Sequence, residues 1–281
     1  VVNQEPSDQS LTVGDVLTLT VGASGIGTDQ TLTYQWKFNG GDITGANSAT
    51  YSLANVKAND AGKYTCVITN KCGTVTSREV VVTVCIPPAI TTHPSGADLK
   101  VGSSLSLSVV ATGTTLTYQW KKDGTNIAGA TNANYSISSV VATDAATYTC
   151  EVTGACGTVT SNGAVVTVCT PPAFTLTGHP EAQSLDENDN LTLSVTATGD
   201  NLTFQWKKDN AVIAGATGQT YSVQNVSYSD AGSYTCTVTG SCGNITSNAA
   251  VVTVCVSPSI TNPAAKNLTE GDPLSLSVTA T

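Results

Sequence analysis

The sequence predicts an all-β chain in which one small two-sheet domain is repeated in tandem, with the copies arranged end to end. Three cysteines recur with steps of 84 and then 86 residues, at positions 66, 72 and 85, at 150, 156 and 169, and at 236, 242 and 255. Trp36, Trp120 and Trp206 keep the same steps. A period of this size indicates one domain copied along the chain. Such an array favours a mechanical or spacing function over catalysis.

The amino-acid composition is typical of β-strands and argues against some classes of binding partner. Charged residues make up only 11% of the chain, the net charge is −9, and Ser and Thr are abundant. Few charges and many threonines are typical of strands with polar outward faces. The negative charge argues against nucleic acid or an anionic membrane surface as a partner. Because no apolar stretch approaches the roughly 20 residues of a membrane-spanning helix, we expect no membrane insertion by this segment.

The period divides the chain into four parts. They are repeat 1 at 1–85, repeat 2 at 86–169, repeat 3 at 170–255 and a partial repeat 4 at 256–281. Val1 aligns with Ala89, just past the Cys-Ile-Pro-Pro junction at 85–88, so the first strand of repeat 1 is expected to be truncated. Residues 273–281 match 104–112 and are expected to form a strand. We expect this sequence to be a window on a longer repeat chain.

Within repeat 2, apolar and polar residues alternate in five segments, as expected for half-buried strands. Those segments are 105–111, 116–120, 135–137, 144–152 and 158–168. Turn sequences separate them, of which 121–124 and the hairpin turn at 154–157 are the clearest. About seven or eight short strands per repeat, with turn signals between them, predict a β-sandwich.

Four residues of repeat 2 give this sandwich a family resemblance. Trp120 and the spacing Asp144-x-x-x-Tyr148-x-Cys150 resemble the immunoglobulin fold of intermediate type. Repeats 1 and 3 carry the fuller pattern Asp-Ala-Gly-x-Tyr-x-Cys at 60–66 and 230–236. The resemblance covers the whole chain and implies tyrosine corners and a buried Trp in each repeat. The implied core residues are Trp36, Trp120, Trp206, Tyr64, Tyr148 and Tyr234.

One departure from the immunoglobulin pattern concerns the cysteines. The fold usually places a cysteine on its second strand, opposite the one on its sixth strand. Here the second-strand positions are valines, at 21, 109, 195 and 278. The usual disulfide between the sheets therefore cannot form. We expect Cys66, Cys150 and Cys236 to be buried free thiols that pack as small hydrophobic side chains.

The other cysteines lie at the two ends of the last strand. Cys156 and Cys169 are separated by about 12 residues, or roughly 40 Å of strand, which is too far for a disulfide. Cys150 and Cys156 are also poorly placed, at roughly 13 Å along the chain. In an immunoglobulin sandwich the first strand starts at the pole that carries the last hairpin turn, so the resemblance implies the pairs Cys85–Cys156 and Cys169–Cys242. By the same rule Cys72 and Cys255 would pair with cysteines outside this sequence.

The residues that usually carry chemistry indicate no catalytic, cofactor or metal site. His93 and His179 occupy equivalent repeat positions, where repeat 1 has Glu5, so we interpret them as structural. No Cys-x-x-Cys pair is present and no histidine lies near the cysteines in the sequence. The acidic run at 186–190 could bind calcium, but it aligns with the turns at 12–16 and 100–104. Both interpretations of that run stay open, and we do not expect an enzyme.

Three strings of repeat 2, at 117–124, 127–131 and 155–162, carry a second resemblance. They resemble the Ig-like repeats of giant secreted surface proteins of Bacteroidota, which include gliding-motility adhesins exported by the type IX secretion system. The resemblance implies an extracellular position at the bacterial cell surface. The disulfides, if formed, imply the same oxidising compartment.

Three functions are compatible with these observations. The first is a stalk or filament segment of a large secreted cell-surface adhesin, stiffened by inter-repeat disulfides. The second is a ligand-binding module for glycans or proteins, and the third is a spacer beside a secreted enzyme domain. Aromatic residues are only 5% of the chain and most take core positions, whereas a binding module would concentrate them in one set of loops. This favours the stalk, whose main partners are neighbouring repeats of the same chain.

Overall fold

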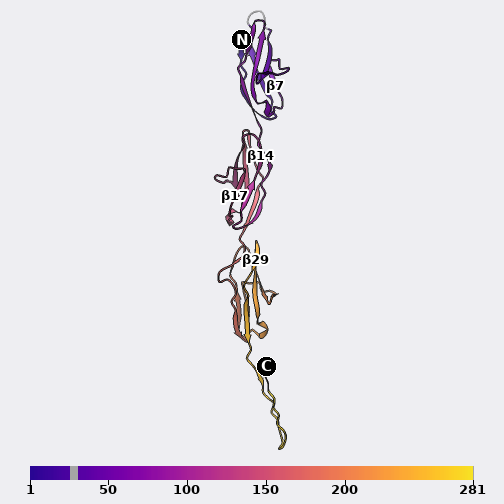
Figure 1. Ribbon diagram of the computed structural model, residues 1–281, viewed down its shortest axis with the longest axis vertical. Coiled ribbons are helices and arrows are strands. Elements are labelled where there is room, and N and C mark those ends of the chain that lie inside the picture. Colours follow the sequence, from indigo (N-terminus) through magenta and orange to yellow (C-terminus); the bar gives the residue numbers. More distant parts are fainter. Residues whose placement is uncertain (26–30, 281) are drawn as a thin grey trace. The chain divides into compact units, whose positions relative to one another are not determined.

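A computed structural model of the chain describes residues 1–25 and 31–280, and almost all of its regular structure is β-strand (Figure 1). The described helical elements are single 3-10 turns, η1 (Ala58–Asp60), η2 (Ala142–Asp144) and η3 (Tyr228–Asp230). None of the helices in the described residues is long or apolar enough to cross a membrane. The chain forms two compact units, which are Val1–Asp98 with Ser104–Ser139 and Thr143–Thr167, and Leu99–Ser103 with Val140–Ala142 and Val168–Thr281.

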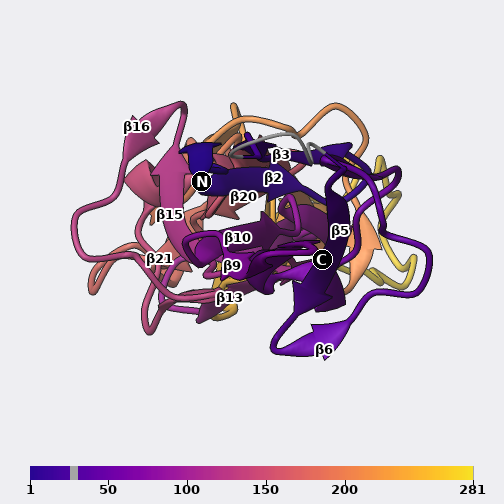
Figure 2. The same cartoon turned by 90° about the horizontal axis from the view of Figure 1, so that it is seen from above.

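The described residues of repeat 1 form one six-stranded sheet and two two-stranded sheets. The large sheet has the order β2 (Gln9–Thr12), β10 (Val80–Cys85), β8 (Gly62–Asn70), β5 (Thr33–Phe38) and β6 (Gly41–Asp42), with β9 (Gly73–Thr76) also on β8. The small sheets pair β1 (Val2–Gln4) with β4 (Gly22–Ala23), and β3 (Leu17–Thr20) with β7 (Thr50–Leu53). Strands β2 and β10 run parallel and lie side by side (Figure 2).

Repeats 2 and 3 use the same sheet order. In repeat 2 the large sheet is β12 (Ala97–Lys100), β20 (Ala164–Cys169), β18 (Ala146–Gly154), β15 (Thr117–Lys122) and β16 (Thr125–Asn126), with β19 (Gly157–Thr160) on β18; the small sheets are β11 (Ala89–Thr92) with β14 (Val110–Thr112), and β13 (Leu105–Ser108) with β17 (Asn134–Ile137). In repeat 3 the large sheet has the order β22 (Gln183–Asp186), β30 (Ala250–Cys255), β28 (Gly232–Gly240), β25 (Thr203–Lys208) and β26 (Ala211–Val212), with β29 (Gly243–Thr246) on β28. The small sheets of repeat 3 pair β21 (Ala173–Phe174) with β24 (Ala197–Thr198), and β23 (Leu191–Ser194) with β27 (Thr220–Val223).

Two segments expected to be single strands are each divided. The segment 105–111 becomes β13 and β14, which pair in different sheets, so the chain changes sheet at the buried Val109. The segment 158–168 becomes β19 and β20, separated at Ser161. The Ser161 hydroxyl accepts the Cys150 amide at 2.9 Å and donates to the Asn162 carbonyl at 2.9 Å. The side chain thus replaces a ladder hydrogen bond, which is why the strand is interrupted there.

The partial fourth repeat differs from the expectation of a strand over 273–281. Of this range residue 281 lies outside the described residues, and within 273–280 the one strand is β32 (Thr279–Ala280), which pairs with β31 (Ile260–Thr261). The described residues of this segment are exposed. Isolated two-stranded pairings are marginally stable, in keeping with the short β31–β32 pairing among the described residues.

Candidate functional site

The core of each repeat is built around one Trp and one Tyr. Trp120 is 0% exposed, and its indole N–H donates to the Asn132 carbonyl at 2.9 Å. The Tyr148 hydroxyl donates to the carbonyl of Asp144, four residues earlier, at 2.9 Å. Equivalent bonds are made by Trp36, Trp206, Tyr64 and Tyr234. Each tyrosine therefore ties the 3-10 turn to the strand that follows it, as in a tyrosine corner.

A free cysteine lies directly opposite each tryptophan on the neighbouring strand. Trp36 pairs with Cys66, and the same register joins the equivalent residues of repeats 2 and 3. All three thiols are 0% exposed and free. Burial raises the pKa of Cys66 and Cys150 from the ordinary 9.0 to about 11, because the thiolate would lose its hydration. The stability that the neutral thiols of Cys66 and Cys150 contribute is complete below pH 9 and is lost as the pH rises through about 11.

The burial of Cys150 leads to a labelling prediction. With a pKa of about 11, about one Cys150 thiol in a thousand is ionised at pH 8, and the side chain is enclosed. We expect iodoacetamide to modify the exposed Cys72 and Cys255 in native protein while Cys66, Cys150 and Cys236 react only after denaturation. Peptide mass spectrometry over a time course measures this, with the two exposed thiols as internal controls. Rapid native labelling of Cys150 would contradict its place in the core.

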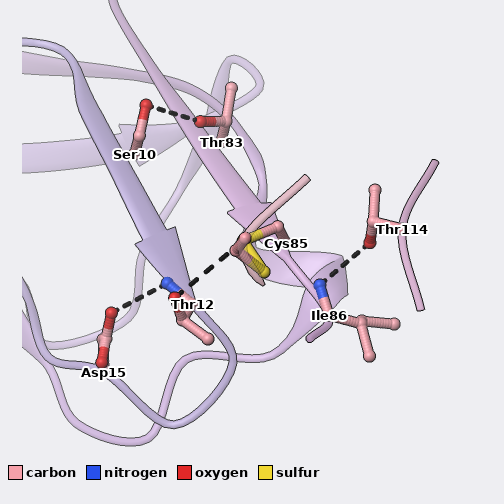
Figure 3. The surroundings of a disulfide bond; sticks show 8 residues. Ser10, Thr12, Asp15, Thr83, Cys85, Ile86 and Thr114 are labelled. Carbon is pink, nitrogen blue, oxygen red and sulfur yellow. Dashed lines mark hydrogen bonds between the residues drawn. A yellow bond between two sulfur atoms is a disulfide. The ribbon is translucent and has the colours of Figure 1, made fainter. Parts of the chain in front are cut away.

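The first repeat junction is built around a disulfide between Cys85 and Cys156. Cys85 ends β10, and its Cα atom is 6.1 Å from that of Cys156 in the hairpin turn between β18 and β19. The Cys85 carbonyl accepts the Val13 amide at 3.0 Å, which fixes the end of β10. Figure 3 shows the neighbouring contact, in which the Ile86 amide donates to the Thr114 hydroxyl at 2.9 Å. A short covalent path therefore joins the last strand of repeat 1 to the last hairpin of repeat 2.

Backbone hydrogen bonds hold the linker against that hairpin. The Thr114 amide donates back to the Ile86 carbonyl at 3.0 Å, and the Ala155 amide donates to the Thr114 carbonyl at 2.9 Å. Pro88 follows and lies close to two glycines. A Cβ atom on Gly113 would be 2.9 Å from the Pro88 Cα, and one on Gly154 would be 3.2 Å from its Cδ. The small residues therefore form a seat into which Pro88 fits.

The second junction repeats this construction with one change of side chain. Cys169 and Cys242 are bonded, with Cα atoms 6.0 Å apart. The Thr170 amide donates to the Asp200 carboxylate at 2.5 Å, where the first junction uses a threonine hydroxyl. The Ser241 amide donates to the Asp200 carbonyl at 2.9 Å. Pro172 is buried beside Gly199 and Gly240, so the seat is the same.

Sequence reasoning missed the residues that form these seats. Thr114 and Asp200 occupy the same repeat position, each directly after a glycine, at Gly113 and Gly199. That recurrence is a signal that the sequence does contain. The role of these two residues depends on contact between the neighbouring glycine and a proline some 25 residues earlier in the chain. A pattern of adjacent residues does not reveal that contact.

The two histidines and the acidic run at 186–190 make hydrogen bonds to the backbone. The Nδ1 atoms of His93 and His179 accept the amides of Asn162 and Asn248 at 3.1 and 3.0 Å. In the acidic run the Asp189 carboxylate accepts the Asp186 amide at 2.9 Å, closing a turn as Asp15 does on Thr12. Within residues 1–25 and 31–280, no group of three or more His, Cys, Asp or Glu side chains is arranged to hold a metal ion.

Several known proteins are similar in sequence to this chain. Human hemicentin-1 is 28% identical over 303 residues, which covers 100% of this chain and 5% of that protein. Mouse hemicentin-1 is 32% identical over 211 residues, covering 70% of this chain and 4% of that protein. Rat Roundabout homolog 1 is 24% identical over 275 residues, covering 86% and 16%. The chain therefore spans only a small part of the curated relatives it matches.

Solved structures agree on the fold. Immunoglobulin domains 1–5 of Sidekick-1 match with a TM-score of 0.52 at 20% identity, covering 92% of this chain and 59% of that one. A structure of Dpr2 Ig1–Ig2 in complex with DIP-Theta Ig1–Ig3 matches with a TM-score of 0.51 at 18% identity, covering 91% and 99%. The immunoglobulin domain family model matches residues 1–70, 87–153 and 171–239, one segment in each repeat. The chain therefore belongs to the immunoglobulin domain family, as a tandem array of all-β domains.

Proposed function

We propose that this chain is a non-enzymatic, load-bearing stalk segment of a large secreted adhesin at the bacterial cell surface. Its units are the repeats 1–85, 86–169 and 170–255, arranged end to end, with a partial repeat at 256–281. One observation carries the proposal. Both ends of the last strand segment of repeat 2 carry a disulfide, Cys156 to Cys85 on one side and Cys169 to Cys242 on the other.

This arrangement gives tension a covalent route past most of each crosslinked repeat. Force that arrives at Cys85 crosses to Cys156, follows β19 and β20 to Cys169, and crosses to Cys242. Since the sequence separation of the first pair is 71, the 70 residues between its cysteines lie outside the route. The loaded segment is already extended strand, so it lengthens little under force. Such a stalk transmits shear while its crosslinked repeats lengthen little.

Two further observations support the proposed position at the bacterial cell surface. Disulfides persist in oxidising compartments, which supports an extracellular position. The relatives named above are human, mouse and rat proteins, and the bacterial surface is supported by the resemblance of the strings at 117–124, 127–131 and 155–162. Neighbouring repeats of the same chain are the proposed main partners, with surface glycans or proteins as targets of the whole adhesin. Gliding motility and type IX export belong to the same proposal.

Small-angle X-ray scattering tests the end-to-end arrangement. Three repeats of about 40 Å each give a rod of about 120 Å with a radius of gyration of about 35 Å. A compact chain of the same length would have a radius of gyration of about 19 Å. We expect the larger value in oxidised protein, with the pair distribution of an elongated particle. A radius near 19 Å would contradict a stalk.

A further inference from the structure

A buried free thiol lies close in sequence to each inter-repeat disulfide, and the tension route makes no use of it. In repeat 2 this thiol is Cys150 on β18, with five residues between it and the bonded Cys156. Cys236 stands in the same relation to Cys242 in repeat 3. A nucleophilic sulfur and a disulfide sulfur that it can attack therefore recur at a fixed spacing within one strand and its hairpin.

In the folded repeat the thiol and the disulfide are kept apart. The Cys150 side chain is 0% exposed and lies opposite Trp120 on the neighbouring strand. Gly154 pairs with Gly157 at the end of the β18–β19 hairpin, so Cys156 lies in the turn beyond that strand. At about 3.3 Å per strand residue, Cys150 is about 13 Å from the turn, too far for the two sulfurs to react directly.

The loaded segment of repeat 2, β19 and β20, also keeps Cys150 enclosed. Strand β20 places Val166 in the core, and the Ser161 hydroxyl between the two strands accepts the Cys150 amide at 2.9 Å. When tension extracts this segment, those contacts are lost and the rest of repeat 2 remains as a loop closed by the Cys85–Cys156 bond. Cys150 is then exposed in a slack loop, while the disulfide beside it is under load.

We propose that Cys150 is an internal nucleophile that opens the Cys85–Cys156 crosslink when repeat 2 unfolds under load, and that Cys236 acts in the same way in repeat 3. This rests on the load-bearing function proposed above. Because the cost of loop closure rises with loop length, attack across five residues is favoured over attack by a thiol from another repeat. The crosslink then limits load, since a folded repeat stays locked and an unfolded one becomes free to lengthen.

The step is a thiol–disulfide exchange within one chain. The Cys150 thiolate attacks the Cys156 sulfur in line with the Cys85 sulfur, so that the Cys150–Cys156 bond forms and the Cys85–Cys156 bond breaks. Cys85 leaves as a thiolate and takes up a proton equivalent to the one that Cys150 released. One disulfide and one thiol are present before and after. The load then passes along the chain from Cys85 to Cys150, which adds about 65 residues, or about 230 Å at about 3.5 Å per residue.

Single-molecule pulling at a held force measures the exchange. The protein carries Cys72→Ser and Cys255→Ser, which remove the two exposed free thiols. At pH 8.5, close to the ordinary pKa of an exposed thiol, we expect the short extension of each crosslinked repeat to be followed by a separate later step of about 230 Å. At pH 6 the rate of the later step should fall roughly a hundredfold, because the thiolate is the attacking form. A rapid ramp, finished before the exchange, should give the short extensions alone.

Variants of the buried thiols identify the nucleophile. In the same background we expect two later steps per molecule. Cys150→Ala or Cys236→Ala should leave one, and both substitutions together should leave none. Cys66→Ala is the matched control, since Cys66 is an equally buried free thiol in repeat 1, and it should leave both later steps and their rates unchanged.

A second measurement is independent of how well the variants fold. The oxidised protein with Cys72→Ser and Cys255→Ser is unfolded in guanidinium chloride at pH 8.5 without reductant, quenched with acid and alkylated. Peptide mass spectrometry should find the pairs Cys150–Cys156 and Cys236–Cys242, with Cys85 and Cys169 alkylated. Retention of the original pairs would overturn the proposal.

The pulling outcomes separate this proposal from the load-bearing function. Short extensions with no later step at pH 8.5, later steps that persist without Cys150 and Cys236, or later steps of only a few residues would overturn the exchange and leave the tension route intact. A long first extension from each crosslinked repeat would contradict the tension route itself, and the exchange with it.

Discussion

Replacing Cys85 and Cys156 together by alanine is expected to lower the free energy of unfolding of repeat 2 by about 4 kcal/mol. The disulfide closes a loop with a sequence separation of 71, and by the loop-entropy relation a loop of that length restricts the unfolded chain by about this amount. This exceeds the effect of most single substitutions. The native packing changes little, because each side chain loses only its sulfur.

Hydrogen exchange followed by mass spectrometry measures this repeat by repeat. Peptides from β15 and β18 should exchange faster in the Cys85→Ala, Cys156→Ala variant, while peptides from β25 and β28 should keep their rates. Cys72→Ala is the matched control, since Cys72 is exposed and free, and it should change neither set. Equal protection of β18 in the variant and in the oxidised parent would show that the crosslink does not stabilise the repeat.

The parts of this fold that follow local pattern are visible in the sequence. Period-two alternation marks the strands. The recurrence of Trp120 and Cys150 in every repeat marks the repeat itself, because both residues face the core on adjacent strands. The divided strands are less visible. Val109 continues the alternation that precedes it, although the chain changes sheet there, and Ser161 looks like any polar strand residue until its hydroxyl meets the Cys150 amide.

At the junctions, too, the sequence reveals only the features that do not depend on contacts between distant residues. The cysteine positions combined with the immunoglobulin resemblance point to Cys85–Cys156 and Cys169–Cys242 as partners, because the resemblance supplies the pole at which the first strand begins. The seat beside the Cys85–Cys156 disulfide forms only where the backbone of Pro88 comes close to that of Gly113, and these two residues are far apart in the sequence. Residues 273–280 show the opposite case: their alternation suits a strand, yet β32 is the one strand that the structure describes among them.

Single-molecule pulling between the two ends of the chain tests the covalent tension route most directly, and the chain contains its own control. Among the residues that the structure describes, Cys72 is a free cysteine, so within this chain no disulfide bypasses repeat 1. Repeats 2 and 3 are bypassed through Cys85–Cys156 and Cys169–Cys242. Under oxidising conditions we expect one long extension, from the roughly 85 residues of repeat 1, or about 300 Å of contour at about 3.5 Å per residue.

In the same oxidised molecules repeats 2 and 3 should each release no more than about 13 residues, or about 45 Å. After reduction all three repeats should give long extensions of similar size. Three long extensions from protein shown by mass spectrometry to hold both disulfides would contradict the load-bearing route.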